Sequence, residues 1–182
     1  MRSTVVKSPS RFVREEIGSE LRFGLSSEEI ARCADLEFDA PDWPARNAGE
    51  PGSVRARAVA NPPGARDLAV VNSDLWRSAT IPAVNLHTTA MAIARFFHEL
   101  MEGPIGAIMS APQFEGDDLF IGQRTVWGLG VALEPDGTWG MGGLGGNAGW
   151  ADPRRGQGIA YVTRRLGDFT TVDRIEQALA ES

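Results

Sequence analysis

The sequence predicts an α+β fold in which helices pack on an antiparallel sheet. Three observations predict it: a strong helical pattern over residues 85–101, a change of the apolar period to two at residue 126, and an amphipathic helix that closes the chain. A hydrophobic content of 42% in 182 residues suffices for a packed core. We expect one domain over residues 1–182, with a mainly helical and loop part (1–125) followed by the sheet and a C-terminal helix (126–182).

Two short helices are predicted near the N-terminus. Ser10 precedes apolar residues that share one side of a helix. Ser26 and Glu29 have the spacing of a capping box, in which each side chain bonds the backbone of the other residue, and this second helix is expected to end by about Leu36. Residues 39–64 contain five prolines and little periodicity. This segment is therefore predicted to be a long irregular connection of the kind that often borders a site.

The clearest helical signal lies in residues 85–101, where Thr88 can cap the first turn and apolar residues recur at steps of three and four. The Gly-Pro pair that follows is expected to stop this helix. The last helix is expected to be capped by Thr170 or Thr171, with its apolar side facing the rest of the chain. Helices therefore precede and follow the predicted sheet.

Alternation of apolar and polar residues predicts strands over residues 126–133, 147–151 and 157–163. Pro, Asp and Gly residues predict turns at 135–138 and 152–156, which connect these strands. Short connections favour antiparallel pairing, so the late part of the chain is expected to form an antiparallel sheet.

Charge and cysteine content exclude several functions. The net charge of −6 makes nucleic acid a poor partner. Cys33 is the single cysteine, so neither an intrachain disulfide nor a cysteine-based zinc site can form. No run of 18 apolar residues and no apolar core in the first ten residues is present, so we expect no membrane span, no secretion signal and a cytoplasmic location.

Two patterns invite a ligand interpretation. His98 and Glu102 stand four residues apart on the predicted helix, at the spacing of the two histidines in zinc proteases, but Glu102 replaces the second histidine and a solvated helix face is strongly favoured. The glycine-rich residues 140–147 are able to cradle phosphate, yet they lie between two predicted strands and contain no lysine, which favours a sharp, backbone-exposing bend. Trp139 and Trp150 flank this run and either wall a groove or belong to the core. No cofactor and no metal is expected.

Four stretches together resemble the C-terminal part of serine hydrolases related to class C β-lactamases, a group that also holds penicillin-binding proteins and esterases of actinobacterial type. The stretches are Phe12-Val13-Arg14-Glu15-Glu16-Ile17, Phe23-Gly24-Leu25 with residues 26–35, residues 72–85, and Trp127-Gly128-Leu129-Gly130 with residues 140–153. Their order and spacing are more specific than any one motif, and the resemblance extends from about residue 10 onward.

The resemblance implies a helical domain beside an antiparallel sheet, with an active site at their junction where a Ser-x-x-Lys serine is acylated by an ester or amide. In this group a late strand carries Lys-Thr-Gly or His-x-Gly. That position falls on Met141, Gly142 and Gly143, so methionine replaces the lysine or histidine. With Asn85 and Trp139, these residues are the candidates for a pocket that takes a small ester or amide.

The serine-lysine pair and the tyrosine motif of the group lie upstream of the part that this sequence resembles. We therefore expect an incomplete β-lactamase/transpeptidase-like fold that lacks the N-terminal strands and the nucleophile segment, and that is not catalytic by itself. An open sheet edge is expected to recruit a second copy or an N-terminal partner chain. The alternatives are a binding protein that reuses the pocket without chemistry, or one half of a split enzyme.

Overall fold

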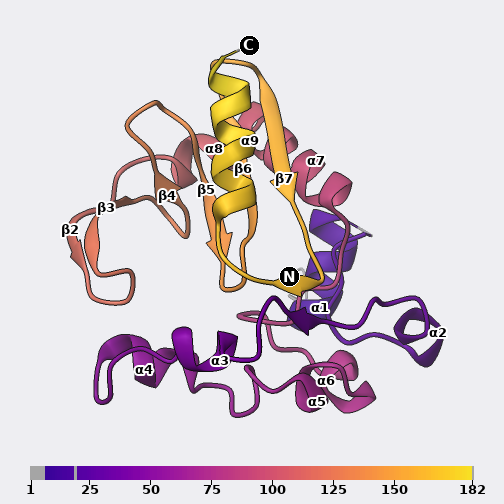
Figure 1. Cartoon of the computed structure of the whole chain (residues 1–182). Coiled ribbons are helices and arrows are strands. Elements are labelled where there is room, and N and C mark those ends of the chain that lie inside the picture. The colour runs from indigo at the N-terminus through magenta and orange to yellow at the C-terminus, as the bar shows by residue number, and fades with distance from the viewer. Residues whose placement is uncertain (1–6, 19, 182) are drawn as a thin grey trace, which may run out of the picture.

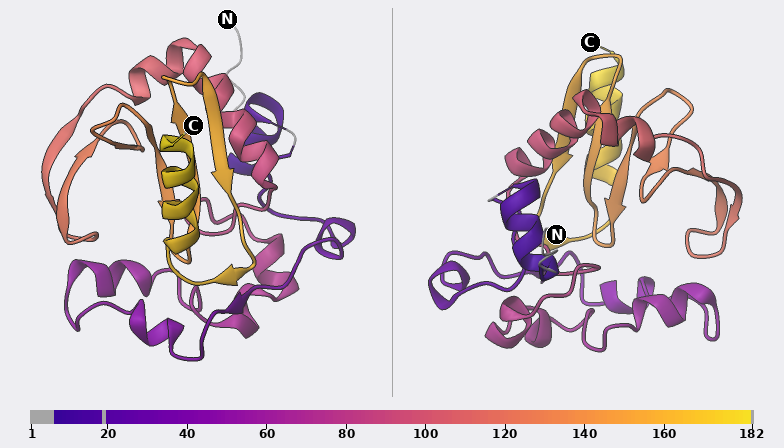
Figure 2. Two further views of the ribbon diagram at one scale, coloured as in Figure 1. Left: turned by 45° about the horizontal axis from the view of Figure 1, so that its top comes forward. Right: turned by 180° about the vertical axis from the view of Figure 1, so that it is seen from behind.

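The computed structural model describes residues 7–18 and 20–181 and has two layers (Figure 1). The upper layer is an antiparallel sheet with helices on both faces, and the lower layer consists of short helices and loops, which lie beneath the sheet in Figure 2. The predicted α+β class is confirmed.

The described elements are helices α1 (Pro9–Phe12), α2 (Ser27–Ile30), α3 (Trp43–Arg46), α4 (Val54–Val59), α5 (Leu68–Val71), α6 (Asp74–Ser78), α7 (Ala90–Glu102), α8 (Pro104–Met109) and α9 (Thr170–Ala180), the π-helical turn η1 (Val13–Ile17), and strands β1 (Glu37–Phe38), β2 (Phe114–Asp118), β3 (Gln123–Trp127), β4 (Ala132–Leu133), β5 (Trp139–Gly143), β6 (Asn147–Asp152), β7 (Gln157–Tyr161) and β8 (Arg165–Leu166).

The main sheet has six strands in the order β2-β3-β4-β5-β6-β7, and all neighbours are antiparallel. Each strand pairs with the next one along the chain, as expected where the connections are short. In the described part of the chain, β2 and β7 are the two edges of this sheet. Strands β1 and β8 form a separate parallel pair of two residues each.

The sheet begins earlier than predicted, at Phe114 instead of residue 126. Sequence alternation missed β2 and the start of β3 because most of their residues are exposed, so no apolar face marks them. The predicted strand 126–133 is interrupted, because Gly128 donates to the carbonyl of Val131 and Gly130 adopts a positive φ of 79°. Its two ends belong to β3 and β4, which this turn connects.

Several predicted helix ends shift by one or more residues. Ser8, not Ser10, caps α1, and Thr89, not Thr88, caps α7. The capping box of Ser26 and Glu29 is confirmed, but α2 ends at Ile30, well before Leu36. At the start of α9 no side chain of the cap residue accepts a hydrogen bond; the Asp168 carboxylate, two residues before Thr170, accepts from the Thr170 amide instead.

The segment expected to be irregular is partly helical. Residues 39–64 contain α3 and α4, and Ser53 caps α4 by accepting from the Ala56 amide. Helices of four to six residues are too short to show a periodic pattern, which is why the sequence did not predict them. Gly103 and Pro104 end α7 but also begin α8, since proline is favoured in the first helical turn. None of the helices in the ranges described is long and apolar enough to cross a bilayer.

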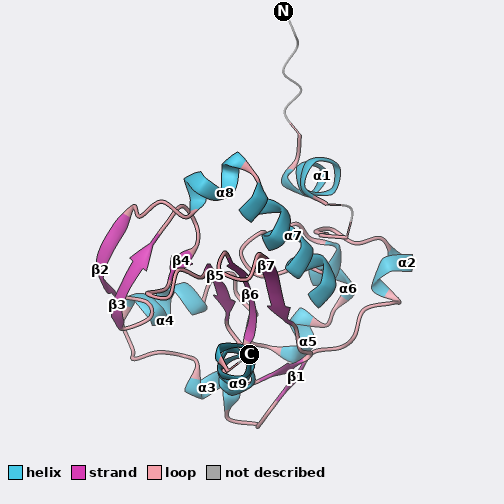
Figure 3. Ribbon diagram, turned by 90° about the horizontal axis from the view of Figure 1, so that it is seen from above, coloured by secondary structure: helices cyan, strands magenta, loops and turns pink. Residues whose placement is uncertain are grey.

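Helix α7 packs directly on β6 and β7, while α9 lies against the opposite face of the sheet (Figure 3). Glycines make this close contact possible: a Cβ on Gly158 would lie 1.9 Å from the carbonyl oxygen of Ala94, and one on Gly149 would lie 2.4 Å from the side chain of Ile93. Phe97 of α7 meets Trp139 edge to face, with 6.0 Å between ring centroids, at the centre of the core. Burial of these large rings stabilises the sandwich of helix and sheet.

The two layers meet at Gly167. Its amide donates to the carbonyl of Gly145 in the β5–β6 turn, at 3.0 Å, and its carbonyl accepts from the Trp43 indole, at 2.9 Å. Trp43 is fully buried and stacks on Phe38 of β1, with 5.0 Å between ring centroids. One residue therefore connects the turn of the upper layer to α3 of the lower layer.

The β2–β3 hairpin forms a second connection between the layers. At its tip, the ring of Phe120 lies 5.1 Å from the guanidinium carbon of Arg55 on α4, in a cation–π arrangement. The same arginine donates to the Phe120 carbonyl at 3.4 Å. The hairpin consequently reaches from the sheet down to α4, as Figure 1 shows.

Asp152 fixes the β6–β7 turn to α9. This carboxylate is almost fully buried, caps the amides of Arg154 and Arg155, and forms an ion pair with the Arg155 guanidinium at 2.7 Å. Arg155 in turn donates to the Leu179 carbonyl near the end of α9. Burial by itself raises the pKa of Asp152, but the hydrogen bonds from Arg155 and Arg154 outweigh it and hold the pKa below its ordinary value of 3.8.

Gly158→Ala tests the contact between α7 and β7. We expect a loss of about 3 kcal/mol in the free energy of unfolding, because the new methyl group overlaps backbone atoms of α7 that cannot move independently. Urea denaturation measures this free energy. Gly143→Ala is the matched control, since its Cβ would have no neighbour closer than 3.5 Å. Equal stability of the two variants would contradict this packing.

Asp152→Asn tests the turn. We expect about 2 kcal/mol less stability at pH 7, since the Arg155 guanidinium loses its charged acceptor. Because the folded-state pKa is lowered, the carboxylate stabilises the fold above pH 3.8, and this contribution is lost as the pH falls through the folded-state value. The variant should therefore lose less stability than the parent on acidification below pH 3.8. Asp117→Asn, on the exposed strand β2, is the control. The same dependence of stability on pH in the parent and in Asp152→Asn would refute the stabilising role of the Asp152 carboxylate.

Candidate functional site

The predicted site strand is β5, and its side chains alternate between the two faces of the sheet. Trp139 and Met141 point to the side of α7, because their partners across β6 are Ala151 and Gly149. Gly140 and Gly142 face the side of α9. Trp139 is buried in the core, whereas 51% of Met141 is exposed. The strand therefore starts in the core and ends at the surface.

The second half of β5 has an unpaired backbone edge. Strand β4 pairs with β5 only at Trp139 and Gly140, whereas β6 pairs with β5 along its whole length to Gly143. Residues 141–143 therefore have, in the described ranges, no strand partner on the side away from β6. Two of these three residues are glycines, so a ligand can approach the main chain closely. Such an edge offers N–H and C=O groups for hydrogen bonds to a carbonyl or an extended ligand.

Glycine is required in the turn that follows β5. Gly145 and Gly146 have positive φ angles of 105° and 87°. A Cβ on Gly146 would also lie 2.0 Å from the carbonyl oxygen of Asp168. The run is therefore a strand end followed by a tight turn into β6, as the bend interpretation predicted, with no helix after it to form a phosphate loop.

Exposed apolar side chains flank the unpaired edge. Leu144 is 39% exposed and Phe169 is 41% exposed. The Phe169 ring covers Gly142, since a Cβ there would lie 2.8 Å from it. Sequence reasoning missed Phe169, because nothing in its local pattern links the residue before α9 to β5. With Met141, these side chains give the edge an apolar border.

Asn85 and Trp139, two predicted pocket residues, are both buried and make contacts within the fold. Asn85 is buried; its amide nitrogen donates to the carbonyls of Trp76 and Ala79, and its Oδ1 accepts from the Ile81 amide. Both N–H donors are thus used between α6 and the loop that follows it, and none of these bonds reaches β5. Trp139 packs in the core, and Trp150 is buried on the opposite face of the sheet. The structure brings together only Met141, Gly142 and Gly143 of the five candidates.

Among the described residues, neither histidine and no atom of Tyr161 has a hydrogen bond to residues 141–143 of β5. His98 and Glu102 are exposed on α7, and no group of three metal-ligating side chains occurs in residues 7–18 and 20–181. His87 forms a β-bridge with Arg22, and burial lowers its pKa, so its imidazole is neutral at pH 7. Tyr161 ends β7, the edge strand.

A family profile described as beta-lactamase matches residues 10–182. The chain belongs to the beta-lactamase family. Solved structures with the same fold agree with this: the chain is similar to a family VIII carboxylesterase, with 24% identity and a TM-score of 0.75 over 96% of this chain and 52% of that chain.

Two further solved structures share the beta-lactamase fold. One is a penicillin-binding protein homolog from Caulobacter crescentus, with 28% identity and a TM-score of 0.69 over 89% of this chain and 48% of that chain. The other is EstA from Arthrobacter nitroguajacolicus Rue61a, with 22% identity and a TM-score of 0.65 over 89% of this chain and 50% of that chain. The chain thus spans about half the length of these structures. A search of the curated proteins found no match.

Proposed function

We propose that this chain is the sheet-bearing C-terminal part of a beta-lactamase-related serine hydrolase, and that it forms one wall of a pocket for a small ester or amide. The unpaired edge of β5 at residues 141–143 carries this proposal. Its main-chain groups can bond the carbonyl of such a ligand, and glycines leave room for it. The names of two of the similar structures, a carboxylesterase and a penicillin-binding protein homolog, support esters or amides as the ligand class.

The same chain is proposed to be non-catalytic by itself. Its sequence contains no Ser-x-x-Lys, and a serine needs a positioned base to become a nucleophile. At the β5 position where related sequences carry lysine or histidine, Met141 offers a thioether, which neither holds nor transfers a proton at neutral pH. Hydrolysis therefore needs a nucleophile and a base from a complementary segment.

The unpaired edge of β7 supports the binding of such a complementary segment. Its sequence, Gln157-Gly158-Ile159-Ala160-Tyr161, has no charged residue and no proline, the residues that usually keep sheet edges from pairing. In the described chain β7 pairs only with β6, while α7 supports one of its faces. We propose that this edge takes a strand of the complementary segment and that, without it, a second copy binds there instead.

The chain alone should not react with a fluorophosphonate, because no activated serine attacks the phosphorus. Intact-mass spectrometry should show no adduct, and 4-nitrophenyl acetate should be cleaved no faster than by the denatured chain. A full-length carboxylesterase of the same fold is the positive control. A stoichiometric adduct on any serine of this chain would refute the non-catalytic assignment.

Sedimentation should show concentration-dependent association of the purified chain through β7. Gln157→Lys, which adds a charge at the exposed start of this strand, should weaken association at least severalfold. Gln177→Lys, on the exposed face of α9, adds the same charge away from any strand and should leave association unchanged. A monomer at every concentration, or equal effects of the two substitutions, would contradict pairing at the β7 edge.

A further inference from the structure

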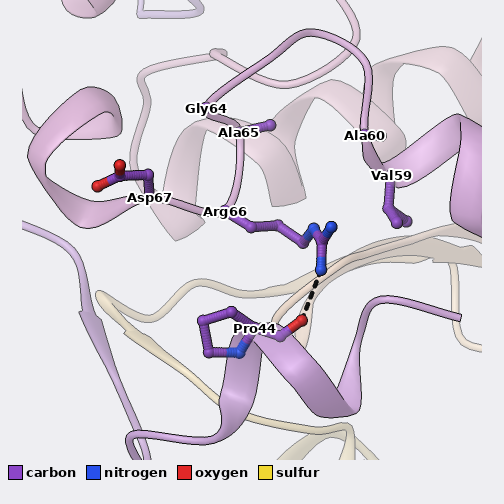
Figure 4. A pocket seen from close by; sticks show the side chains of 7 residues that line it. All are labelled: Pro44, Val59, Ala60, Gly64, Ala65, Arg66 and Asp67. Carbon is purple, nitrogen blue, oxygen red and sulfur yellow. Dashed lines mark hydrogen bonds between the residues drawn. The ribbon is translucent and has the colours of Figure 1, made fainter.

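A groove of about 400 Å³ lies in the lower layer, apart from β5 (Figure 4). It is lined by Pro44 of α3, Val59 and Ala60 at the end of α4, and residues 64–67 of the loop before α5. This volume is within the range of small-molecule sites in proteins. Polar and apolar groups line it in nearly equal parts, and the Arg66 guanidinium extends across it.

Arg66 is fixed in the groove and keeps free donors. One terminal nitrogen donates to the Pro44 carbonyl at 2.5 Å, which holds the side chain across the groove. No carboxylate of the described chain forms an ion pair with it. Its neighbour Asp67 points away from the guanidinium in Figure 4 and caps α5 by accepting from the Ala69 amide. The remaining N–H groups of Arg66 therefore have no protein acceptor among the described residues.

Some arginines of the lower layer lack a carboxylate partner within the described ranges. Residues 39–67 contain four arginines and four acidic residues, and Arg46 forms ion pairs with Asp39 and Asp42. Arg55 and Arg57 on α4, like Arg66, donate to backbone carbonyls and form no ion pair with described residues. These guanidinium groups therefore keep N–H donors for an anionic ligand.

We propose that this groove binds a small carboxylate with a compact apolar body. A planar guanidinium presents parallel N–H donors that match a carboxylate, and the bond to Pro44 already orients them. Val59, Ala60 and Ala65 supply apolar contacts for the rest of the ligand. The site is separate from β5, so it does not depend on the proposed hydrolase role.

Titration of the purified chain with benzoate, followed by amide NMR, tests the site. Signals of residues 64–67 should shift with benzoate, and the neutral isostere benzamide should bind at least tenfold more weakly. Arg66→Gln should weaken benzoate binding about tenfold, as expected for loss of a charged hydrogen bond. Arg57→Gln is the matched control, because it removes an equally unpaired arginine that does not line the groove.

Ala65→Met keeps Arg66 and narrows the groove, and it should also weaken binding. The NMR spectrum of Arg66→Gln shows whether this substitution disturbs the fold. If it does, Ala65→Met tests benzoate binding in its place. Equal binding of benzoate and benzamide, equal loss in the Arg66 and Arg57 variants, or unchanged binding in Ala65→Met would each overturn the proposal.

Discussion

The contact between the β5–β6 turn and Gly167 determines how the candidate site is built. Gly146 has no side chain, so the backbone at Asp168 lies directly against the turn, and Gly167 bonds Gly145 on one side and Trp43 on the other. The end of β5 is thereby fixed with respect to the lower layer. Since Trp43 is fully buried, this attachment resists solvent competition, unlike an exposed hydrogen bond.

Local sequence signals predicted the elements whose pattern is set by burial on one face. Helix α7, strands β6 and β7 and the capping box at Ser26 follow from periodicity or from side-chain chemistry within a few residues. Strand β2 and helices α3 and α4 were not predicted, because an exposed strand and helices of four to six residues show no such period. Their formation depends on partners distant in sequence.

The candidate site was only partly predictable for the same reason. The family resemblance located residues 141–143, and the structure places them at the surface end of β5. The free backbone edge was not predictable, because it depends on how far β4 pairs, and β4 is shortened by the Gly128–Gly130 turn that precedes it. For Trp139 and Asn85 the sequence could not distinguish a core position from a pocket position, because large aromatics and amides serve in both.

The Arg55–Phe120 contact is a weaker attachment between the layers than the one at Trp43. It is a cation–π pair on partly exposed side chains, worth about 1 kcal/mol, whereas the attachment at Trp43 is buried and stacked. The hairpin is therefore held to α4 less firmly than the β5–β6 turn is held to α3. Loss of the Arg55 side chain would therefore release the hairpin tip from α4 and leave the attachment at Trp43 in place.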